Sequence, residues 1–311
     1  MKANIIKNTK WFLSLSVIFV ALAMVSIVVF GFNLGIDFKS GSMWQVRVPS
    51  ANEESLKSFF SKDLNIEEPI ISYDVSTNSY AVIFEETSDA DHYAYLDKMK
   101  EKFGSVEDLD FGTTSPSVSA ELKQKAVWII VLSLIVMAVY ITIAFRKVSY
   151  PVKSYKYGVV TLVALAHDVI IASGVFALVG YLNGAVIDTN FIVALLMIAG
   201  FSSQDTIVVL DRIRENLLSS KNREDLGEIV DRSINEVFRR SINTSFCIML
   251  VLVAVAFLGP LSMRYFALTM FVGMFFGTYS SLFVASPLLV LWHKLDDARD
   301  SKKSGKRSLI S

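Results

Sequence analysis

Long apolar runs alternate with charged segments along this chain and predict several membrane spans. A helix crosses a hydrocarbon layer of about 30 Å with about 20 apolar residues. Six runs reach that scale with few or no charges, and they cover residues 11–32, 126–145, 158–182, 191–210, 241–258 and 266–292. We therefore expect an α-helical integral membrane protein with six transmembrane helices.

The first run is too long for a cleaved signal peptide. Three lysines precede it, and Ala21-Leu22-Ala23 has the small-x-small form of a cleavage site. The apolar stretch nevertheless continues to Phe30, whereas the apolar region of a signal peptide covers about 7–15 residues. We expect an uncleaved membrane anchor.

Positive charges gather on one side of the expected membrane. The segments that share this side hold twenty Lys and Arg residues, and they are 1–10, 146–156, 211–240 and 293–311. The opposite loops, 183–190 and 259–265, carry one base, Arg264. Because Lys and Arg mark cytoplasmic loops, we expect both termini in the cytoplasm, with a charged cytoplasmic loop at 211–240 and a basic cytoplasmic tail at 293–311.

The long segment 33–125 then lies outside the cytoplasm and has the pattern of a small α+β domain. Alternating or turn-bounded apolar runs predict strands at 42–48, 69–75, 80–86 and 105–113. Helical spacing predicts helices at 52–64 and 89–103. The order β-α-β-β-α-β is typical of a ferredoxin-like sheet. Acidic residues outnumber basic ones here, 17 to 9, which argues against a domain that grips anionic lipid.

The charged loop 211–240 is rich in helix-forming residues, and two arrangements remain open for it. In one, the loop lies along the membrane surface with Ile229, Ile234, Val237 and Phe238 toward lipid. In the other, it forms a solvated helical hairpin.

Asp205 lies inside the fourth apolar run and is the main candidate for chemistry. It precedes Asp211 by six residues, or about 9 Å at a rise of about 1.5 Å per residue. A charge at that depth costs at least about 2–3 kcal/mol unless it is paired or hydrated. Packing between helices needs only neutral polar groups, so we favour an ion-coupling role over a simple packing hydrogen bond.

Three further ionisable residues belong to this set. His167 and Asp168 lie about ten residues into the third run. Neighbours on a helix point about 100° apart, so we expect them to face different partners, either as a proton relay or as a structural pair. Arg240 opens the fifth run and either anchors that helix at the interface or points inward and neutralises Asp205.

The composition excludes several other functions. The formal net charge is +0, which gives no field for nucleic acid. His92, His167 and His293 are far apart in sequence, which disfavours a histidine metal site. Asp168 and Asp205 lie on neighbouring runs like the pair of an intramembrane aspartyl protease, but the Gly-x-Gly-Asp form is missing. We expect no catalytic residues, no metal, no cofactor and no enzymatic activity.

Five stretches together resemble the SecD/SecF family of protein-export membrane subunits. They are GIDFKSG (35–41), SPSVSAEL (115–122), ALAHDVIIASGVFAL (164–178), GFSSQDTIVVLDRIREN (200–216) and RRSINTSF (239–246). Their order around one outside domain covers all six runs, and the chain length is similar to that of the shorter, SecF branch of the family.

This resemblance implies a fold, a function and a set of partners. The fold would be half of a resistance-nodulation-division type bundle in a bacterial cytoplasmic (inner) membrane. The function would be that of an accessory subunit that uses transported H⁺ or Na⁺ to drive late steps of polypeptide export. The implied partners are a SecD-like subunit, a SecYEG-type channel, the translocating polypeptide and membrane lipid, with no nucleic acid.

The resemblance also implies roles for single residues. Asp205 would be the coupling carboxylate and Arg240 its charge partner, with His167 and Asp168 in the same relay. Supporting polar residues are expected at Gln204, Thr206, Asp211 and Asn243, and the motif after the first span at Gly35, Asp37, Phe38 and Gly41. The chain departs from the family pattern at Gln204, where Asn is usual, at Ser40, which breaks a Gly-Gly pair, and at Ser115, where Gly is usual.

Two other functions remain open. A half-subunit of an ion-driven exporter of lipids or small molecules would use the same buried carboxylate, although the single small outside domain argues against it. A passive scaffold would need no ionisable residues inside its spans.

Overall fold

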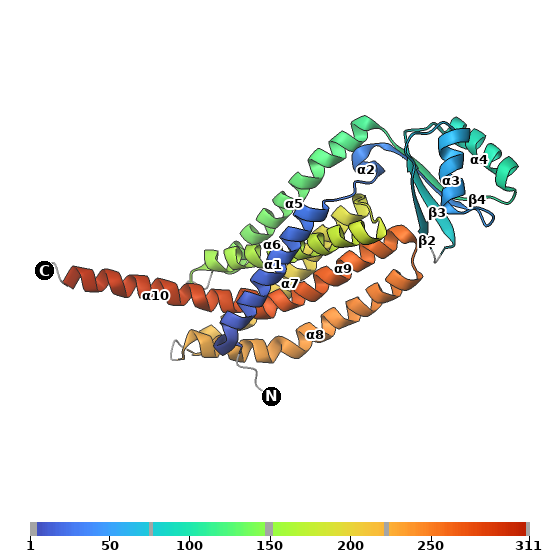
Figure 1. The fold of residues 1–311 in the computed structure, drawn as a ribbon. Coiled ribbons are helices and arrows are strands. Elements are labelled where there is room, and N and C mark those ends of the chain that lie inside the picture. Colours follow the sequence, from blue (N-terminus) through green and yellow to red (C-terminus); the bar gives the residue numbers. More distant parts are fainter. Residues whose placement is uncertain (1–4, 75–76, 147–151, 221–223, 309–311) are drawn as a thin grey trace.

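A bundle of long helices carries a small α+β domain at one end (Figure 1). The computed structural model describes residues 5–74, 77–146, 152–220 and 224–308. Six helical segments of this described part are long and apolar enough to cross a membrane: Ile6–Phe30, Pro116–Ala144, Ser154–Asn183, Thr189–Ser220, Leu226–Leu258 and Met263–Arg299. The expected six-helix architecture is confirmed.

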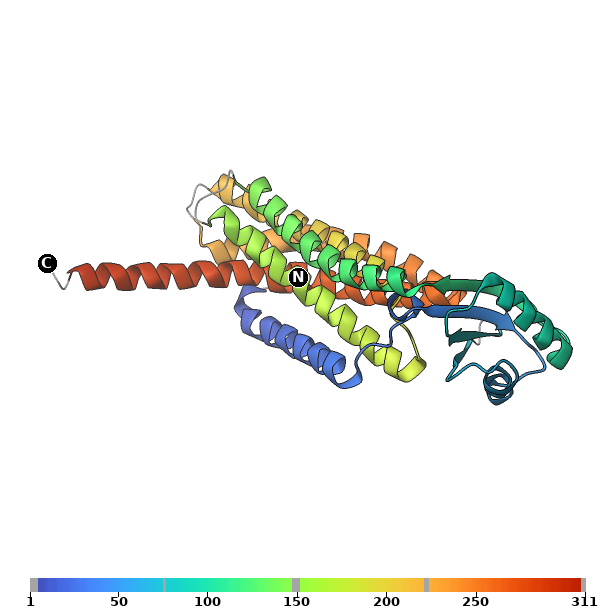
Figure 2. The ribbon, with the colours of Figure 1, turned by 90° about the horizontal axis from the view of Figure 1, so that it is seen from above.

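The spans correspond to named helices with the following bounds. They are a 3-10 turn η1 (Ile6–Asn8), α1 (Thr9–Phe30), α5 (Pro116–Ala144), α6 (Ser154–Asn183), α7 (Thr189–Ser220) and α8 (Leu226–Leu258). The last span combines α9 (Leu261–Ser280), a π-helical turn η3 (Ser281–Ala285) and α10 (Ser286–Ser308). Figure 2 shows that α10 leaves the bundle at the end opposite the α+β domain.

The predicted charged loop 211–240 is helical over most of its length. Helix α7 continues to Ser220 and α8 begins at Leu226, so only residues 221–225 separate them. Ile229, Ile234 and Val237 are buried, at 1%, 0% and 8% exposure, whereas Phe238 is 39% exposed. Of the two arrangements left open, the one with the first three residues toward lipid is wrong. Their apolar face packs into one core cluster with residues of α7 and with Ile5 at the start of the described chain.

The N-terminal segment is fixed to the N-terminal part of α8 by hydrogen bonds. The carboxylate of Asp231 accepts from the backbone N–H groups of Ile5 and Ile6, at 2.8 and 2.9 Å. The residues in front of α1 therefore pack in the same cluster as apolar side chains of α8.

The small domain has the expected ferredoxin-like order. Its elements are β1 (Gly41–Arg47), α3 (Glu53–Ser58), a π-helical turn η2 (Phe59–Asp63), β2 (Ile70–Asp74), β3 (Ser79–Phe84), α4 (Asp89–Phe103) and β4 (Glu107–Thr114). The sheet order is β2-β3-β1-β4, and every pair is antiparallel. Apolar and polar residues alternate along these strands because successive side chains point to opposite faces of the sheet.

One face of the sheet forms the core of the domain against α3 and α4. Trp44, Val46 and Val82 are fully buried and pack with Phe60 and Met99 from the helical segments. Such burial stabilises a domain by about 1.5–3 kcal/mol per large apolar side chain. A short helix α2 (Ile36–Lys39) joins α1 to this domain.

Candidate functional site

Asp205 lies in α7, half-buried in the bundle, and hydroxyl groups of two other helices surround it. Its Oδ2 accepts from Ser245 Oγ of α8 at 3.1 Å and from Thr278 Oγ1 of α9 at 3.3 Å. Thr278 Oγ1 also lies 2.7 Å from Ser245 Oγ. Thr278 Oγ1 is also 3.0 Å from Met274 O. A hydroxyl carries one proton, so Thr278 donates to only one of these three acceptors at a time.

A small pocket connects Asp205 with Arg240. The pocket has a volume of about 70 Å³, and Gln204, Asp205, Arg240, Ser241 and Thr244 are among its lining residues. A water molecule needs a cavity of about 10–15 Å³ on this measure, so the pocket has room for several. The side chain of Arg240 is exposed, and the structure shows no salt bridge between it and Asp205, both of which lie in described parts of the chain.

His167 and Asp168 form a direct pair inside the bundle. His167 Nδ1 lies 2.8 Å from Asp168 Oδ1, so the expectation that these neighbours face different partners is wrong. Asp168 is completely buried, and its Oδ2 accepts from Ser202 Oγ at 2.5 Å and from Ser280 Oγ at 2.8 Å.

Helix α9 contacts both carboxylates. Its Ser280 donates to Asp168 on α6, and its Thr278, half a turn earlier, reaches Asp205 on α7. The close approach of α9 to α7 depends on glycine, since a Cβ at Gly277 would lie 3.1 Å from Cβ of Ser202. The π-helical turn η3 follows directly, and such turns occur frequently at functional sites.

The predicted supporting residues do not all meet at this site. Gln204 lines the pocket. Thr206 is buried, and its Oγ1 has no hydrogen-bond partner within the described residues. Asp211 is exposed and pairs with Arg214 at 3.0 Å, and Asn243 is exposed on α8. The roles assigned to Asp205, Arg240, His167 and Asp168 stay predictions.

Sequence reasoning missed the four hydroxyl residues that contact the carboxylates. They are Ser202, Ser245, Thr278 and Ser280. Ser245 lies in the RRSINTSF stretch, and Ser202 lies one helical turn before Asp205, so their positions gave some signal. Serine and threonine are common between membrane helices, so no comparable signal distinguished those of α9.

The motif after α1 connects three parts of the chain. The N–H of Gly35 donates to Ile187 O at 2.8 Å, and a Cβ on Gly35 would lie 2.8 Å from the same oxygen. Asp37 Oδ2 accepts from both N and Oγ1 of Thr189, at 2.8 and 2.6 Å. Phe38 is buried in the bundle cluster nearest the domain. The motif thus holds the start of α7 against the entrance to the domain.

Two residues shape the turn from α2 into β1. Gly41 has φ +126°, and a Cβ there would lie 2.5 Å from Phe84 O, so only glycine fits. Ser40, at the departure from the Gly-Gly pattern, has φ 63° and ψ 164°. This backbone region is essentially restricted to glycine, so Ser40 holds a strained conformation.

Two acidic residues, Asp37 and Asp188, accept hydrogen bonds from the first residues of α7. Asp188 Oδ1 accepts from the N–H of Phe191 at 2.9 Å. Burial raises the pKa of Asp188 above its ordinary value, and the nearby charge of Asp37 acts in the same direction. The negative charges of Asp37 and Asp188 therefore repel each other at the end of the bundle next to the domain.

Comparisons with known proteins agree on one family. The model for the C-terminal part of the protein export membrane proteins SecD and SecF matches residues 94–295, and the SecD/SecF GG motif matches residues 25–48. The protein translocase subunit SecF of Thermobaculum terrenum is 36% identical over 93% of each chain. The SecF subunit of Sebaldella termitidis is 31% identical over 99% of this chain and 97% of its own.

A solved structure shows the same fold. The crystal structure of SecDF from Thermus thermophilus, titled a translocon-associated membrane protein, superposes with a TM-score of 0.81 at 32% sequence identity. The match covers 94% of this chain but 39% of the SecDF chain. The chain therefore spans well under half of that longer relative.

Proposed function

This chain belongs to the SecD/SecF family of protein export membrane proteins, and from that premise we propose that it couples ion movement through Asp205 to polypeptide export. The family gives it a role in protein export as a multi-pass membrane protein. The finer proposal is that a proton or sodium gradient drives a late step, in which the secreted polypeptide leaves a SecYEG-type channel.

One observation carries this proposal. Asp205 lies half-buried among the spans, and it shares with Arg240 a pocket that has room for several water molecules, while it forms no salt bridge with Arg240. A carboxylate inside a membrane is costly unless it is paired, hydrated or neutral. The pocket offers hydration, Arg240 offers a counter-charge, and the hydroxyls of Ser245 and Thr278 accommodate either ionisation state.

Two states of Asp205 then favour two arrangements of the bundle. An ionised Asp205 draws the donors of Ser245, Thr278 and Arg240 toward it. When an ion neutralises the carboxylate, Thr278 donates to Ser245 or to Met274 O instead, and Arg240 returns to solvent. An elementary charge moved across the membrane is worth about 2.3 kcal/mol per 100 mV, which is enough to change the populations of the two states about 50-fold.

The contacts of α9 and α7 provide a path from this switch to the outside domain. Helix α9 contacts Asp205 and Asp168 through Thr278 and Ser280, and α7 carries Asp205 itself. The outer end of α7 is hydrogen-bonded to Asp37 of the motif that leads into β1. A shift of α7 along its axis therefore pulls on the entrance to the domain.

We propose two further features of the assembly. A SecD-like subunit supplies the second half of the bundle, since the longer SecDF relative contains this half and more in one chain. Both termini lie in the cytoplasm, a placement supported by the start of α1 and the end of α10, which both lie on the side of the bundle away from the domain (Figure 1).

The test compares secretion in cells that carry Asp205→Asn with the wild type, with and without a membrane potential. The variant keeps the shape and removes the titratable charge. We expect loss of the gradient-dependent part of reporter secretion while the complex with the SecD-like subunit still assembles. Thr206→Val, which changes a neighbouring residue outside the pocket, is the control. Unchanged secretion in the Asp205 variant would leave this residue a packing role only.

A further inference from the structure

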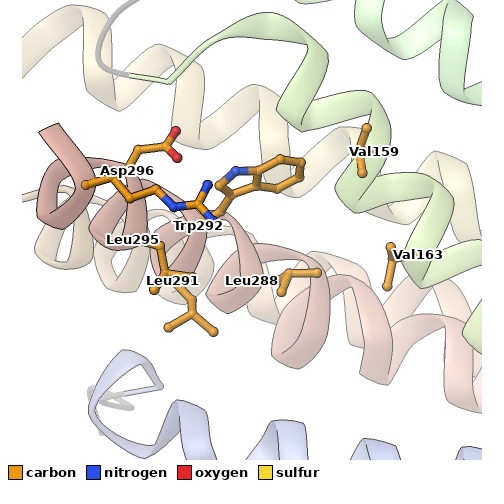
Figure 3. A pocket seen from close by; sticks show the side chains of 8 residues that line it. Val159, Val163, Leu288, Leu291, Trp292, Leu295 and Asp296 are labelled. Atoms are coloured by element: carbon orange, nitrogen blue, oxygen red, sulfur yellow. The ribbon is translucent and has the colours of Figure 1, made fainter. Parts of the chain in front are cut away.

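A second, larger groove lies on the outer surface of the bundle, between α6 and the first turns of α10 (Figure 3). Its volume is about 360 Å³. Val159 and Val163 of α6 face the side chains of α10 across the groove. The α10 wall consists of Leu288, Leu291, Trp292 and Leu295. None of these residues lines the pocket of Asp205.

The walls of the groove are apolar and exposed. Val163 is 45% exposed, Leu291 40% and Leu295 56%. On α6 the two valines are four residues apart, and on α10 the leucines and Trp292 recur at three and four residues, so each helix presents one continuous stripe. Apolar stripes on the outside of a membrane bundle contact hydrocarbon rather than water.

The mouth of the groove is polar and carries an excess of positive charge. Asp296 accepts from the buried Lys156 at 2.5 Å, and Lys156 also lies 5.7 Å from the centre of the Trp292 ring. Arg299 lines the groove and is exposed. Arg299 and Lys153 both act electrostatically on Asp296. Lys156 thus neutralises Asp296, and Arg299 adds a positive charge to the lining.

The groove crosses the expected cytoplasmic surface of the membrane. Leu288 and Arg299 are eleven residues apart, or about 16 Å along α10 at about 1.5 Å per residue. The last predicted apolar run ends at residue 292, between these two residues, so the Leu288 end of the groove lies within the expected hydrocarbon and Arg299 lies beyond it. Tyr155 and Trp292 lie edge to face near the mouth, with ring centres 6.0 Å apart, at the level where aromatic residues gather in membrane proteins.

We infer that this groove binds one anionic phospholipid of the inner leaflet. An acyl chain lies between the α6 valines and the α10 leucines, and the phosphodiester lies at the mouth beside Arg299. The net positive charge of the mouth selects a lipid with a net negative headgroup over a zwitterionic one. An apolar helix of a partner subunit would fill the walls equally well, but it would leave the cations of the mouth without counter-charge.

The test uses the full chain in mild detergent and counts bound lipid by native mass spectrometry during titration with phosphatidylglycerol or phosphatidylcholine. We expect one phosphatidylglycerol to bind more tightly than phosphatidylcholine. A basic residue near a membrane surface strengthens the binding of anionic lipid. Arg299→Gln should therefore weaken phosphatidylglycerol binding about fivefold and leave phosphatidylcholine binding unchanged. Val163→Trp, which fills the groove, should abolish the tight site for both lipids.

A matched control separates the groove from general lipid contact. Val139 lies on α5 with 52% exposure, so Val139→Trp adds the same bulk to a lipid-facing position elsewhere and should change nothing. Val159→Trp repeats the groove-filling test in case Val163→Trp lowers the yield of folded protein. Equal binding of the two lipids, or full phosphatidylglycerol binding in both groove-filled variants, would overturn the inference. Displacement of the lipid by an added SecD-like subunit would also overturn it, because the groove would then be a subunit interface.

Discussion

The double hydrogen bond from Thr189 to Asp37 predicts that the motif after α1 controls the outer end of α7. Asp37→Ala removes both bonds, 2.8 Å from the N–H and 2.6 Å from the hydroxyl. Losing a side-chain cap at a helix start costs about 0.5–2 kcal/mol, and Asp37 is only half-buried. We therefore expect the first turn of α7 to lose about 1–2 kcal/mol of local stability.

Hydrogen exchange of the full-length protein in lipid nanodiscs measures this loss directly. A change of one to two kcal/mol raises the population of an opened state by about 5- to 30-fold, so amides at 189–192 should exchange faster by that factor. Asp37→Asn, which keeps one acceptor, should fall between the alanine variant and the wild type. Asp97→Ala removes an exposed carboxylate from α4 and serves as the control. Unchanged exchange at the start of α7 in Asp37→Ala would refute the role assigned to this contact.

Three other substitutions follow from the same structure. Ser40→Gly relieves a conformation that costs about 1–3 kcal/mol and loses about 0.5–1 kcal/mol to the greater chain entropy of glycine, so the thermal unfolding midpoint should rise; a fall would show that Ser40 is not strained. Gly273→Val places a side chain where even a Cβ would lie 2.3 Å from Ile198, which should cost about 1–3 kcal/mol; Ile198→Ala should restore part of that stability, and a merely additive loss would refute the steric account. Asp188→Asn keeps the hydrogen-bond acceptor at the start of α7. The pKa of Asp188 is raised in the folded protein, so protonated Asp188 contributes to folding stability at low pH. This contribution is lost as the pH rises through the folded pKa. The variant should therefore gain thermal stability over the wild type at neutral pH but not at low pH, and an equal gain at both would contradict the sign.

The apolar pattern was sufficient to predict the six spans and the order of the small domain. Membrane spans need about 20 apolar residues regardless of their neighbours, and a half-buried sheet imposes alternation on its strands. The helix at Asp89–Phe103 even matches the predicted range, because Ser88 caps its start and Gly104 ends it with φ +79°. Such features depend on local sequence, so a single chain reveals them.

The inner ends of α7 and α8 were less predictable because their burial depends on distant residues. Ile229 and Ile234 are covered partly by the segment at Ile5, which Asp231 holds in place from more than 200 residues away. A hydrophobic stripe on a charged helix gives the same pattern whether lipid or another part of the chain covers it. The sequence therefore left two arrangements open, and the extended helices are closer to the hairpin.

In the candidate site, the sequence likewise revealed the ionisable residues but not their hydroxyl partners. Asp205, His167 and Asp168 stood out because an ionisable residue in an apolar run is rare. Their partners Ser280 and Thr278 did not stand out, because a neutral hydroxyl in a membrane helix carries little information about what it contacts. The direct bond between His167 and Asp168 depends on side-chain rotation, which helical spacing alone does not specify.

The most direct test of the central claim measures ion movement through the reconstituted complex. The full chain and its SecD-like partner are placed in liposomes with a pH-sensitive dye or a Na⁺-sensitive dye inside, and a membrane potential is imposed in the presence and absence of Na⁺. Our account predicts potential-driven ion uptake by the wild type and none by Asp205→Asn, with Asp211→Asn, an exposed carboxylate on the same helix, behaving like the wild type. Uptake by Asp205→Asn equal to that of the wild type would contradict the claim that Asp205 couples ion movement to export.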